Sequence, residues 1–299
     1  MIAAAGLAAQ RATLVDLYRA HVAPGSAYAL VDFPDHANVG DSAIWLGECA
    51  LLRRITGREP GYVSTWHDFD AAAFRDACGD ATLFLHGGGN LGDIWGHHQR
   101  FREHLLATVR DRPVVQLPQS IHFRDPAGLA RFAALVAAHP AFTLHVRDRR
   151  SLDVARRHLA CTTHLAPDSA IALGPQPRGT ADCALLMLLR TDDERRDHGD
   201  APPASATVVD WLADDPGLPA TRAAQARARV ARGLRLLSRG EVLVTDRLHG
   251  HILADLLGLP HVVLDNDYGK LAAYRAAWPG TAPAATTMAA AVAAAARLA

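Results

Sequence analysis

Short apolar runs of strand length alternate with helix-like stretches, and this alternation constrains the fold more than any other feature of the sequence. Four such runs lie in the first half of the chain, at 27–33, 81–86, 113–118 and 142–147. Helix-like stretches lie among them, for example 42–55 and 129–139. Strands that alternate with helices form a mostly parallel sheet that is covered on both faces. The sequence therefore predicts an α/β fold.

A second series of apolar runs predicts a second α/β domain. Its members lie at 183–190, 206–212, 241–246 and 261–266. The segment between the two series, 174–182, contains two prolines and two glycines and is typical of a linker. We therefore expect Rossmann-like domains at 1–174 and 175–299, the second ending in a helix within 284–299. Such folds bind ligands near strand carboxyl ends and helix N-termini, so we expect a ligand cleft between the two domains.

Composition limits the classes of ligand that the protein is expected to bind and the cellular compartment in which it is expected to work. The 299 residues include 31 basic and 31 acidic side chains. Nonspecific nucleic-acid binding needs many uncompensated cations, so this balance argues against a nucleic-acid partner and favours a small anion. The four cysteines form no CxxC pair, which argues against a structural zinc site and fits a reducing cytoplasm. No apolar stretch approaches the roughly 20 residues of a membrane-spanning helix, so we expect a soluble, cytoplasmic protein.

Two polar, glycine-containing segments follow predicted strands in the first half of the chain. In 38–48, Asn38 and Gly40 favour a tight turn, and Asp41 or Ser42 can cap the helix that follows. In 86–103, three consecutive glycines favour a loop whose backbone approaches a ligand closely, as in many anion-binding loops.

The glycine-rich segment matches two known sequence patterns, but the chain lacks the second element that each pattern needs for its function. Gly87, Gly89 and Gly92 form a literal GxGxxG, but the next strand ends in Pro118 and Gln119 rather than in the acidic residue of a dinucleotide site. The same segment contains HGGG, an esterase oxyanion pattern, yet the chain has no GxSxG nucleophile elbow. Neither pattern is therefore complete in this chain.

Two further segments place cations at strand ends. Arg147 follows the strand within 142–147, and Ser151 is expected to cap the next helix. Arg247 and His249 lie at the start of a helix that Gly258 and Pro260 terminate. A guanidinium, an imidazole and the positive end of a helix dipole together suit a phosphate or a carboxylate.

Taken together, several ordered segments resemble the polysaccharide pyruvyl transferase family. These segments are NVGDSAI, HGGGNLGDIW with HHQ, LPQSI, VRDRRSL, APDSAIAL, TDRLHGHILADLLGLP and LDNDYGKL, from Asn38 to Lys270. The resemblance implies transfer of the pyruvyl group of phosphoenolpyruvate to a sugar of a polysaccharide or its precursor. A pyruvate ketal forms and phosphate leaves. It also implies a GT-B-like fold of two Rossmann-like domains, the N-terminal one on the acceptor side.

The resemblance also implies roles for individual residues. Phosphoenolpyruvate contacts are implied at His98, Arg147, Arg247, the backbone of Leu248, and His249, with His97 as the one-residue alternative to His98. Arg247 and His249 are the expected catalytic residues, and His249 is expected to transfer a proton. Supporting positions in family motifs are Asp41, Asn90, Asp93, Asp168 and Lys270. No metal or cofactor is expected. The expected partners are phosphoenolpyruvate and a sugar or lipid-linked oligosaccharide, with peripheral membrane association.

The chemistry of the donor fits two separated arginines. Phosphoenolpyruvate carries a carboxylate and a phosphate, and guanidinium groups bind both through planar, charge-assisted hydrogen bonds. We therefore expect Arg147 and Arg247 to face one cleft and to clamp one donor molecule.

Two other functions remain open at the level of sequence. A GT-B-like glycosyltransferase that uses a nucleotide sugar could hold a metal at the DxD patterns Asp68–Asp70 or Asp265–Asp267. A non-catalytic anion-binding protein would keep the arginines but not need His249. For Trp45, Trp66 and Trp95, packing in the core is the first expectation and stacking on a sugar the second.

Overall fold

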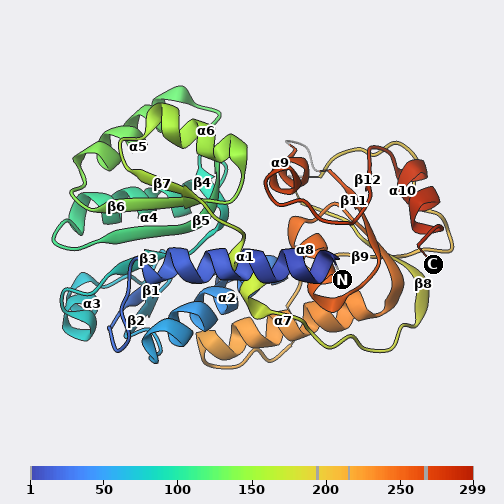
Figure 1. Ribbon diagram of the computed structural model, residues 1–299, viewed down its shortest axis with the longest axis horizontal. Helices are drawn as coiled ribbons and strands as arrows, with labels where there is room; N and C mark the ends of the chain where they lie inside the picture. Colours follow the sequence, from blue (N-terminus) through green and yellow to red (C-terminus); the bar gives the residue numbers. More distant parts are fainter. Residues whose placement is uncertain (1, 193–194, 215, 266–268, 299) are drawn as a thin grey trace. The chain divides into compact units, whose positions relative to one another are not determined.

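The chain folds into two compact units, each with its own parallel sheet (Figure 1). The computed structural model describes residues 2–192, 195–214, 216–265 and 269–298. We call Leu7–Asp35 with Gly47–Ala172 the N-terminal unit, and Met1–Gly6, His36–Leu46 and Leu173–Ala299 the C-terminal unit. The division near residue 173 adjoins the proline-containing segment. Residues 36–46 cluster with the C-terminal residues, although their sequence position suggested the N-terminal domain.

The N-terminal unit is built on a parallel sheet of seven strands. Their order is β2-β1-β3-β5-β6-β7, and β4 pairs with β5. The strands are β1 (Ala29–Val31), β2 (Tyr62–Ser64), β3 (Leu83–Leu85), β4 (Gly88–Gly92), β5 (Val114–His122), β6 (Phe142–Val146) and β7 (Thr162–Leu165). The four apolar runs of the first half form β1, β3, β5 and β6, so those predictions are confirmed. The short strands β2, β4 and β7 were not expected.

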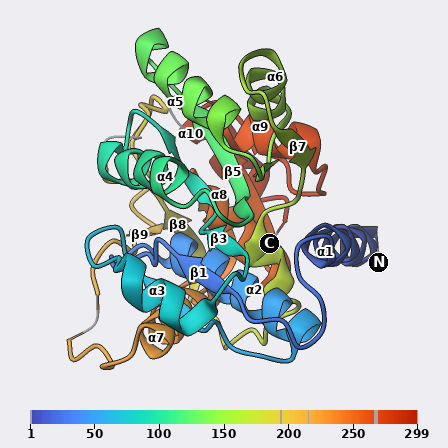
Figure 2. The same cartoon turned by 90° about the vertical axis from the view of Figure 1, so that its left-hand side faces the viewer.

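The helices that lie wholly or mostly in this unit are α1 (Ile2–Arg19), α2 (Val39–Thr56), α3 (Ala71–Cys78), α4 (Gly96–Thr108), α5 (Pro126–Ala138), α6 (Arg149–His158) and the 3-10 helix η1 (Ser169–Leu173). Three of them begin at an aspartate side chain, which caps the helix: α3 at Asp70, α5 at Asp125 and α6 at Asp148. Figure 2 shows α3, α4, α5 and α6 around β3 and β5, and these helices share a buried apolar core with the strands. Asp148, not Ser151, caps α6: its side chain accepts the Ser151 N–H at 2.7 Å.

The C-terminal unit is built on a second parallel sheet, in the order β12-β11-β10-β8-β9. Its strands are β8 (Cys183–Leu188), β9 (Thr207–Val209), β10 (Gly240–Thr245), β11 (His261–Leu264) and β12 (Ala284–Ala285). Its helices are α7 (Arg222–Ser238), α8 (Leu248–Leu257), α9 (Lys270–Ala277) and α10 (Met288–Ala295). The predicted C-terminal helix is thus confirmed over 288–295. As predicted, α8 ends at Gly258, which has a left-handed conformation with φ of 62°.

Both sheets explain the apolar runs of the sequence. Parallel strands covered on both faces are buried throughout, and the strands LFL of β3 and HVVL of β11 are buried at every residue. All strand pairs between the described residues are parallel, so each sheet has one edge at which the carboxyl ends of its strands meet. The fold is therefore a mixed α/β fold with parallel sheets. Among the described residues, no helix is both long enough and apolar enough to cross a membrane.

Candidate functional site

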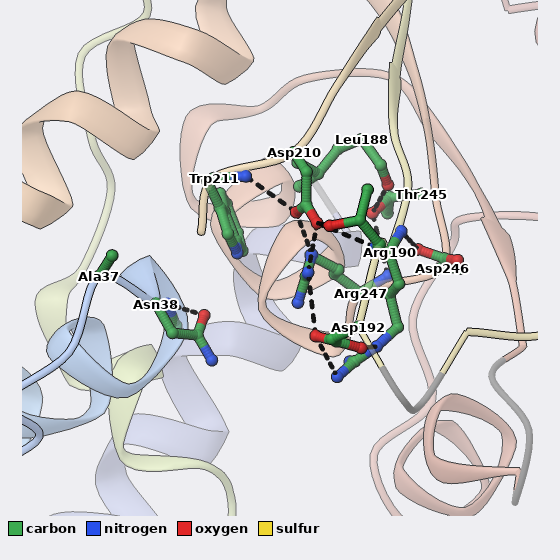
Figure 3. A network of polar contacts seen from close by, with 12 residues as sticks. Ala37, Asn38, Leu188, Arg190, Asp192, Asp210, Trp211, Thr245, Asp246 and Arg247 are labelled. Atoms are coloured by element: carbon green, nitrogen blue, oxygen red, sulfur yellow. Dashed lines mark hydrogen bonds and ion pairs between the residues drawn. The ribbon is translucent and has the colours of Figure 1, made fainter. Parts of the chain in front are cut away.

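Three neighbouring strands of the C-terminal unit carry charged side chains just beyond their carboxyl ends (Figure 3). Arg190 follows β8, Asp210 follows β9, and Arg247 follows β10. Because β8 pairs with both β9 and β10 in parallel, these residues come together at one edge of the sheet. Arg247 also occupies the N-cap position of α8, with extended backbone.

Asp210 holds the guanidinium of Arg247 in a two-point ion pair. Nε of Arg247 donates to Oδ1 of Asp210 at 2.6 Å, and Nη2 donates to Oδ2 at 2.7 Å. Asp210 is itself held, since it accepts the backbone N–H and the hydroxyl of Thr191 and the backbone N–H of Trp211. Arg247 is 2 % exposed. A planar, bidentate pair of this kind fixes both the position and the orientation of the guanidinium.

Asp192 connects a second arginine to the same group. Its carboxylate accepts from Nε and Nη2 of Arg190 at 2.8 and 3.0 Å, and from Nη2 of Arg247 at 3.2 Å. Two guanidinium groups therefore lie at one carboxylate, and the bond from Arg247 to Asp192 is longer than either bond from Arg247 to Asp210. An anion that enters this site competes most easily with Asp192.

His249 lies in the first turn of α8 and packs against the start of α2. A Cβ atom placed on Gly40 would lie 2.2 Å from Nδ1 of His249, so only glycine leaves room for this imidazole. The turn before α2 is closed by Asn38, whose Oδ1 accepts the Gly40 N–H at 3.2 Å and whose amide donates to Asp41 at 2.9 Å. The expectation that Asp41 or Ser42 caps α2 is therefore wrong. Asp41 instead lies in the first turn of α2, where its carboxylate accepts the hydrogen bond from the Asn38 amide.

Backbone N–H groups of the first α8 turn complete this side of the site. Leu248, the first residue of α8, is 2 % exposed, and His249 is 8 % exposed. Helix N-termini present unpaired N–H groups and a positive dipole end, and they bind anions for that reason. The cluster of Arg190, Arg247, His249 and the α8 N-terminus thus has guanidinium, imidazole and N–H donors that can bind a phosphate or a carboxylate in place of Asp192.

Asp246 adds a carboxyl group that can hold a proton near neutral pH. Burial raises its pKa to about 6, against the opposing effects of the Arg190 backbone N–H and the charges of Arg190 and Arg247. Its Oδ1 accepts that N–H at 2.9 Å, and Nε2 of His198 lies 3.7 Å from Oδ2. Asp246 is therefore a second group, besides His249, that could transfer a proton here.

The raised pKa of Asp246 predicts a pH-dependent effect of Asp246→Asn on stability. The pKa of the carboxyl rises from 3.8 to about 6 on folding, so its ionised form destabilises the folded state. This destabilisation is full above pH 6 and fades as the pH falls from 6 to 3.8. We expect Asp246→Asn to raise the melting temperature at pH 8, with a difference that vanishes below about pH 4. Melting curves of both proteins across this range test the expectation, and a difference independent of pH would contradict it.

In the N-terminal unit, the first strand end positions a histidine. Asp32 directly follows β1 and accepts from Nδ1 of His98, on α4, at 2.7 Å. Both are buried, with side-chain exposures of 2 % and 9 %. Asp32 has φ of 68°, and among the described residues it is the one non-glycine residue with positive φ. Such strain is often found at functional sites. With Nδ1 bonded to Asp32, the other ring nitrogen, Nε2, is directed away from that carboxylate.

His97, the alternative to His98, has a different environment. Its ring centroid lies 4.2 Å from that of His98 and 5.0 Å from that of Trp66. Trp66 and Trp95 are 44 % and 39 % exposed, so the expectation of core packing is wrong for both, whereas it is confirmed for Trp45 at 2 %. Trp66, His97 and His98 thus form a row of rings that runs from the surface to the buried Asp32.

The glycine-rich segment binds a carboxylate of the protein itself. Gly87 N–H donates to Oε1 of Glu48 at 2.8 Å, and His86 Nδ1 lies 2.7 Å from Oε2. Glu48 is fully buried, and burial raises its pKa, while His86 and the Gly87 N–H oppose this shift. The following residues, Gly88–Gly92, form strand β4 rather than an open loop. Glu48 thus occupies one N–H donor that the sequence suggested for an external anion.

Arg147 is completely buried in the N-terminal unit, where it pairs with Asp168. Nη1 donates to Oδ2 of Asp168 at 2.6 Å, and Nε donates to the hydroxyl of Ser120 at 3.0 Å. Ser120 in turn donates to Asp148 at 2.7 Å. The side chains of Arg147 and Asp168 are 0 % and 1 % exposed. Asp168, one of the supporting positions, is therefore the counter-ion of Arg147.

The other supporting positions have structural partners. The side-chain oxygen of Asn90 accepts from Arg102 and Gln119 at 2.8 and 2.7 Å. Asp93 accepts the backbone N–H groups of Arg124 and Asp125, both at 2.7 Å. Lys270 is the first residue of α9 and is half-buried.

Aspartates of the two DxD patterns accept hydrogen bonds from nearby backbone N–H groups. Asp68 accepts the N–H and hydroxyl of Thr65, and Asp70 caps α3. Asp265 accepts the N–H of Leu271 at 3.1 Å, and Asn266 and Asp267 lie outside the described residues. The first pattern therefore serves as a turn and a cap.

Several residues of the site were missed by sequence reasoning. Asp32 and Asp246 follow strands directly, so the strand-end argument that selected Arg147 and Arg247 could have found them. Asp210 also follows a strand directly, so the same argument applies to it. Glu48 and Asp192 carry no such signal, because their roles depend on partners elsewhere in the chain.

Comparison with known proteins identifies the family. The sequence model of the polysaccharide pyruvyl transferase family matches residues 38–268. The chain belongs to this family. The polysaccharide pyruvyl transferase match includes Asp41, Asn90, Asp93, His98, Arg147, Asp168, Arg247, Leu248 and His249.

Individual relatives agree with the polysaccharide pyruvyl transferase assignment. Pyruvyl transferase 1 of Schizosaccharomyces pombe is 32 % identical over 296 residues, which cover 89 % of this chain and 73 % of the relative. EpsO of Bacillus subtilis, provisionally named a pyruvyl transferase, is 30 % identical over 278 residues, which cover 83 % and 84 %. A crystal structure of a functionally uncharacterised Klebsiella pneumoniae protein has a similar fold, with a TM-score of 0.56 at 20 % identity, over 89 % of this chain and 93 % of that chain.

Proposed function

We propose that the protein transfers the pyruvyl group of phosphoenolpyruvate to a sugar of a polysaccharide or its precursor, forms a pyruvate ketal and releases phosphate. The observation that carries this proposal is the placement of Arg247, held by Asp210, beside His249 at the N-terminus of α8. Membership of the polysaccharide pyruvyl transferase family supports the reaction class.

The C-terminal cluster is suited to the anionic groups of the donor. Arg247 and the first N–H groups of α8, at Leu248 and His249, would bind the phosphate and stabilise it as it departs. The donor would displace Asp192 from its 3.2 Å bond to Arg247, while Asp210 keeps the guanidinium in place. The site therefore exchanges one carboxylate for an anion of the substrate and leaves no buried guanidinium without a counter-ion.

The reaction needs proton transfer at two points. A sugar hydroxyl adds to C2 of the enol, C3 takes up a proton and becomes a methyl group, and the hydroxyl loses its proton. A second hydroxyl then replaces phosphate at C2, and its proton leaves with the phosphate. We assign proton transfer to His249, and a positioned acid or base of this kind contributes about 10²–10⁴ in rate.

The N-terminal unit would supply further donor contacts at His98 and Arg147. The bond from Nδ1 of His98 to Asp32 would present Nε2 to the substrate. The exposed Trp66 and the ring of His97 beside His98 offer apolar faces on which an acceptor sugar could stack, so we place the acceptor on this unit. We further propose that the two α/β units are the Rossmann-like halves of a GT-B-like enzyme. The enzyme would work in the cytoplasm, on sugars or lipid-linked oligosaccharides at the membrane face.

A coupled assay tests the proposed reaction. The full chain is incubated with phosphoenolpyruvate and a panel of sugars and lipid-linked precursors, and phosphate release and acceptor mass are measured. We expect phosphate release that depends on one acceptor, whose mass rises by one pyruvic acid less one water. Metal-dependent consumption of a nucleotide sugar without any response to phosphoenolpyruvate would favour a glycosyltransferase instead. Binding of phosphoenolpyruvate without turnover on any acceptor of the panel would favour a non-catalytic anion-binding protein.

Replacement of Asp32 tests the positioning of His98. In Asp32→Asn, the amide can offer an N–H to Nδ1 of His98 and so favour the other tautomer, while asparagine tolerates the positive φ. We expect kcat with phosphoenolpyruvate to fall by about 10²–10⁴ with a nearly unchanged melting temperature. As a matched control, Asp125→Asn retains a cap on α5 and should retain activity. Unchanged kcat and unchanged pH dependence in Asp32→Asn would rule out this role.

A further inference from the structure

A group of three metal-ligating side chains lies in the C-terminal unit, apart from the residues assigned to the donor. His251 and Asp255 lie one turn apart on α8, and His261 is the first residue of β11. One ligand atom from each residue lies within 4.8 Å of the other two. Among the described residues, no other group of three or more histidine, cysteine or acidic side chains has this spacing.

The three ligand atoms converge on one point between α8 and β11. Nδ1 of His251 lies 2.7 Å from Nε2 of His261. The two oxygens of Asp255 lie 3.8 Å from Nδ1 of His251 and 3.9 Å from Nε2 of His261. Both imidazoles are buried, with exposures of 2 % and 5 %, whereas the Asp255 side chain is 18 % exposed. The cluster thus has two buried nitrogens and one oxygen on its solvent side.

The tautomer of His261 is fixed by a backbone carbonyl. Its Nδ1 lies 2.9 Å from the carbonyl oxygen of Leu259, which can only accept, so Nδ1 carries the proton. Nε2 therefore presents its lone pair toward His251 and Asp255. This arrangement, in which one ring nitrogen donates to a carbonyl and the other faces the ligand group, is the usual second shell of a metal-bound histidine.

Coordination requires only small side-chain movements. Zinc binds nitrogen at 2.0–2.1 Å, so two nitrogens of a tetrahedral site lie about 3.3 Å apart. The two imidazole nitrogens would separate by roughly 0.6 Å from their hydrogen-bonded distance, and the carboxylate would move inward by about half an ångström. His251 would move its proton from Nδ1 to Nε2. Gly280 adjoins the cluster: a Cβ atom there would lie in ordinary contact distance, 3.8 Å from His251 and 3.9 Å from Asp255.

The charges near the cluster favour a metal that binds through coordination bonds. Asp255 supplies one negative charge, and the half-buried Arg275 supplies a positive charge that acts on all three residues. A hard cation such as Ca²⁺ needs several oxygen ligands and negative charge, which this cluster lacks. Two imidazoles and one carboxylate instead suit Zn²⁺, Co²⁺ or Ni²⁺.

We propose that His251, Asp255 and His261 form a binding site for one transition-metal dication of the Zn²⁺ type, with a fourth position open to water. The metal would join α8, whose N-cap is Arg247, to strand β11 of the same unit. It would therefore hold α8 against its own sheet. This site does not depend on the proposed transferase reaction.

Metal titration of the tag-free, full-length chain tests the proposal. After removal of metal with a chelator, Zn²⁺ stoichiometry is measured by equilibrium dialysis, Co²⁺ binding by visible absorption, and stability by melting curves. We expect one equivalent of Zn²⁺, a Co²⁺ spectrum of tetrahedral or five-coordinate type, and a rise in melting temperature of roughly 5–10 °C at 100 times the dissociation constant. Ca²⁺ and Mg²⁺ should give no such rise.

Variants test whether Zn²⁺ binds at this cluster rather than at the four cysteines or at surface histidines. His251→Gln, His261→Gln and Asp255→Asn should each weaken Zn²⁺ binding at least tenfold and remove the Zn²⁺-induced rise in melting temperature. His104→Gln changes an exposed histidine of α4 and should bind as the parent does. The melting temperature of each variant without metal shows whether it folds. Binding of less than a tenth of an equivalent, equal stabilisation by Ca²⁺, or parent-like affinity in folded His251→Gln and His261→Gln would overturn the proposal.

Discussion

Arg247→Gln is expected to lower phosphoenolpyruvate-dependent turnover by at least about 10²-fold, the effect of removing one preorganised donor from a charge-stabilising site. The guanidinium is held by two bonds to Asp210 and lies at the N-terminus of α8, so glutamine cannot restore its charge or its two-point geometry. The loss should appear in kcat/KM for phosphoenolpyruvate, measured by phosphate release at saturating acceptor.

A second arginine of the same unit provides the control for this variant. Arg239 pairs with Asp182 at 2.9 Å, but both side chains are about half exposed, and exposed pairs contribute little to stability. Arg239→Gln should therefore keep the turnover and melting temperature of the parent. Near-normal kcat/KM in Arg247→Gln would exclude a donor role for this arginine.

The Asp210→Asn variant separates the orientation of the Arg247 guanidinium from the charge with which it binds the donor. The amide oxygen can still accept one bond, but the two-point pair with Arg247 and its charge are lost. We expect a smaller loss of kcat/KM than in Arg247→Gln, because the guanidinium remains and the asparagine oxygen can still accept one of its two bonds. A loss as large as that of Arg247→Gln would mean that orientation, rather than charge, dominates the contribution of Arg247.

The strands of both sheets could be predicted because burial on both faces requires continuous apolar runs. Strands β2 and β7 were not predicted because their sequences, YVS and TTHL, contain no long apolar run, and Thr162 of β7 is exposed. Strand β4 was not predicted for a different reason: its sequence, GGNLG, has the composition of a turn.

The site residues, like the strands, divide into those that the sequence indicates and those that it does not. Arg147 and Arg247 could be selected because a charged residue one or two positions after a buried strand reaches the sheet edge where ligands bind. Their counter-ions could not be assigned, because Asp168 and Asp210 lie 21 and 37 residues away and meet them only through strand register. Glu48, 38 residues before His86, shows the same limit.

Arg147→Met should destabilise the protein by about 3–5 kcal/mol, because it leaves the buried carboxylate of Asp168 without its counter-ion. For a chain of this size the melting temperature should fall by roughly 10 °C. Phosphoenolpyruvate-dependent turnover should also be lost. Loss of activity in this variant alone could follow from unfolding, so melting curves and phosphate release are measured on the same preparation.

The double variant Arg147→Met/Asp168→Asn separates the structural from the functional role of Arg147. Asparagine removes the unpaired charge and its oxygen can still accept the Ala170 N–H, which Asp168 accepts at 2.9 Å in the parent, so most of the lost stability should return. If Arg147 contacts the donor, turnover stays lost in this refolded protein, and the loss appears in kcat/KM for phosphoenolpyruvate. If turnover returns together with stability, Arg147 and Asp168 are only a buried ion pair, and Arg247 binds the donor without it. Combination with Arg247→Gln extends the test, since two arginines that contact one anion should have effects that do not add.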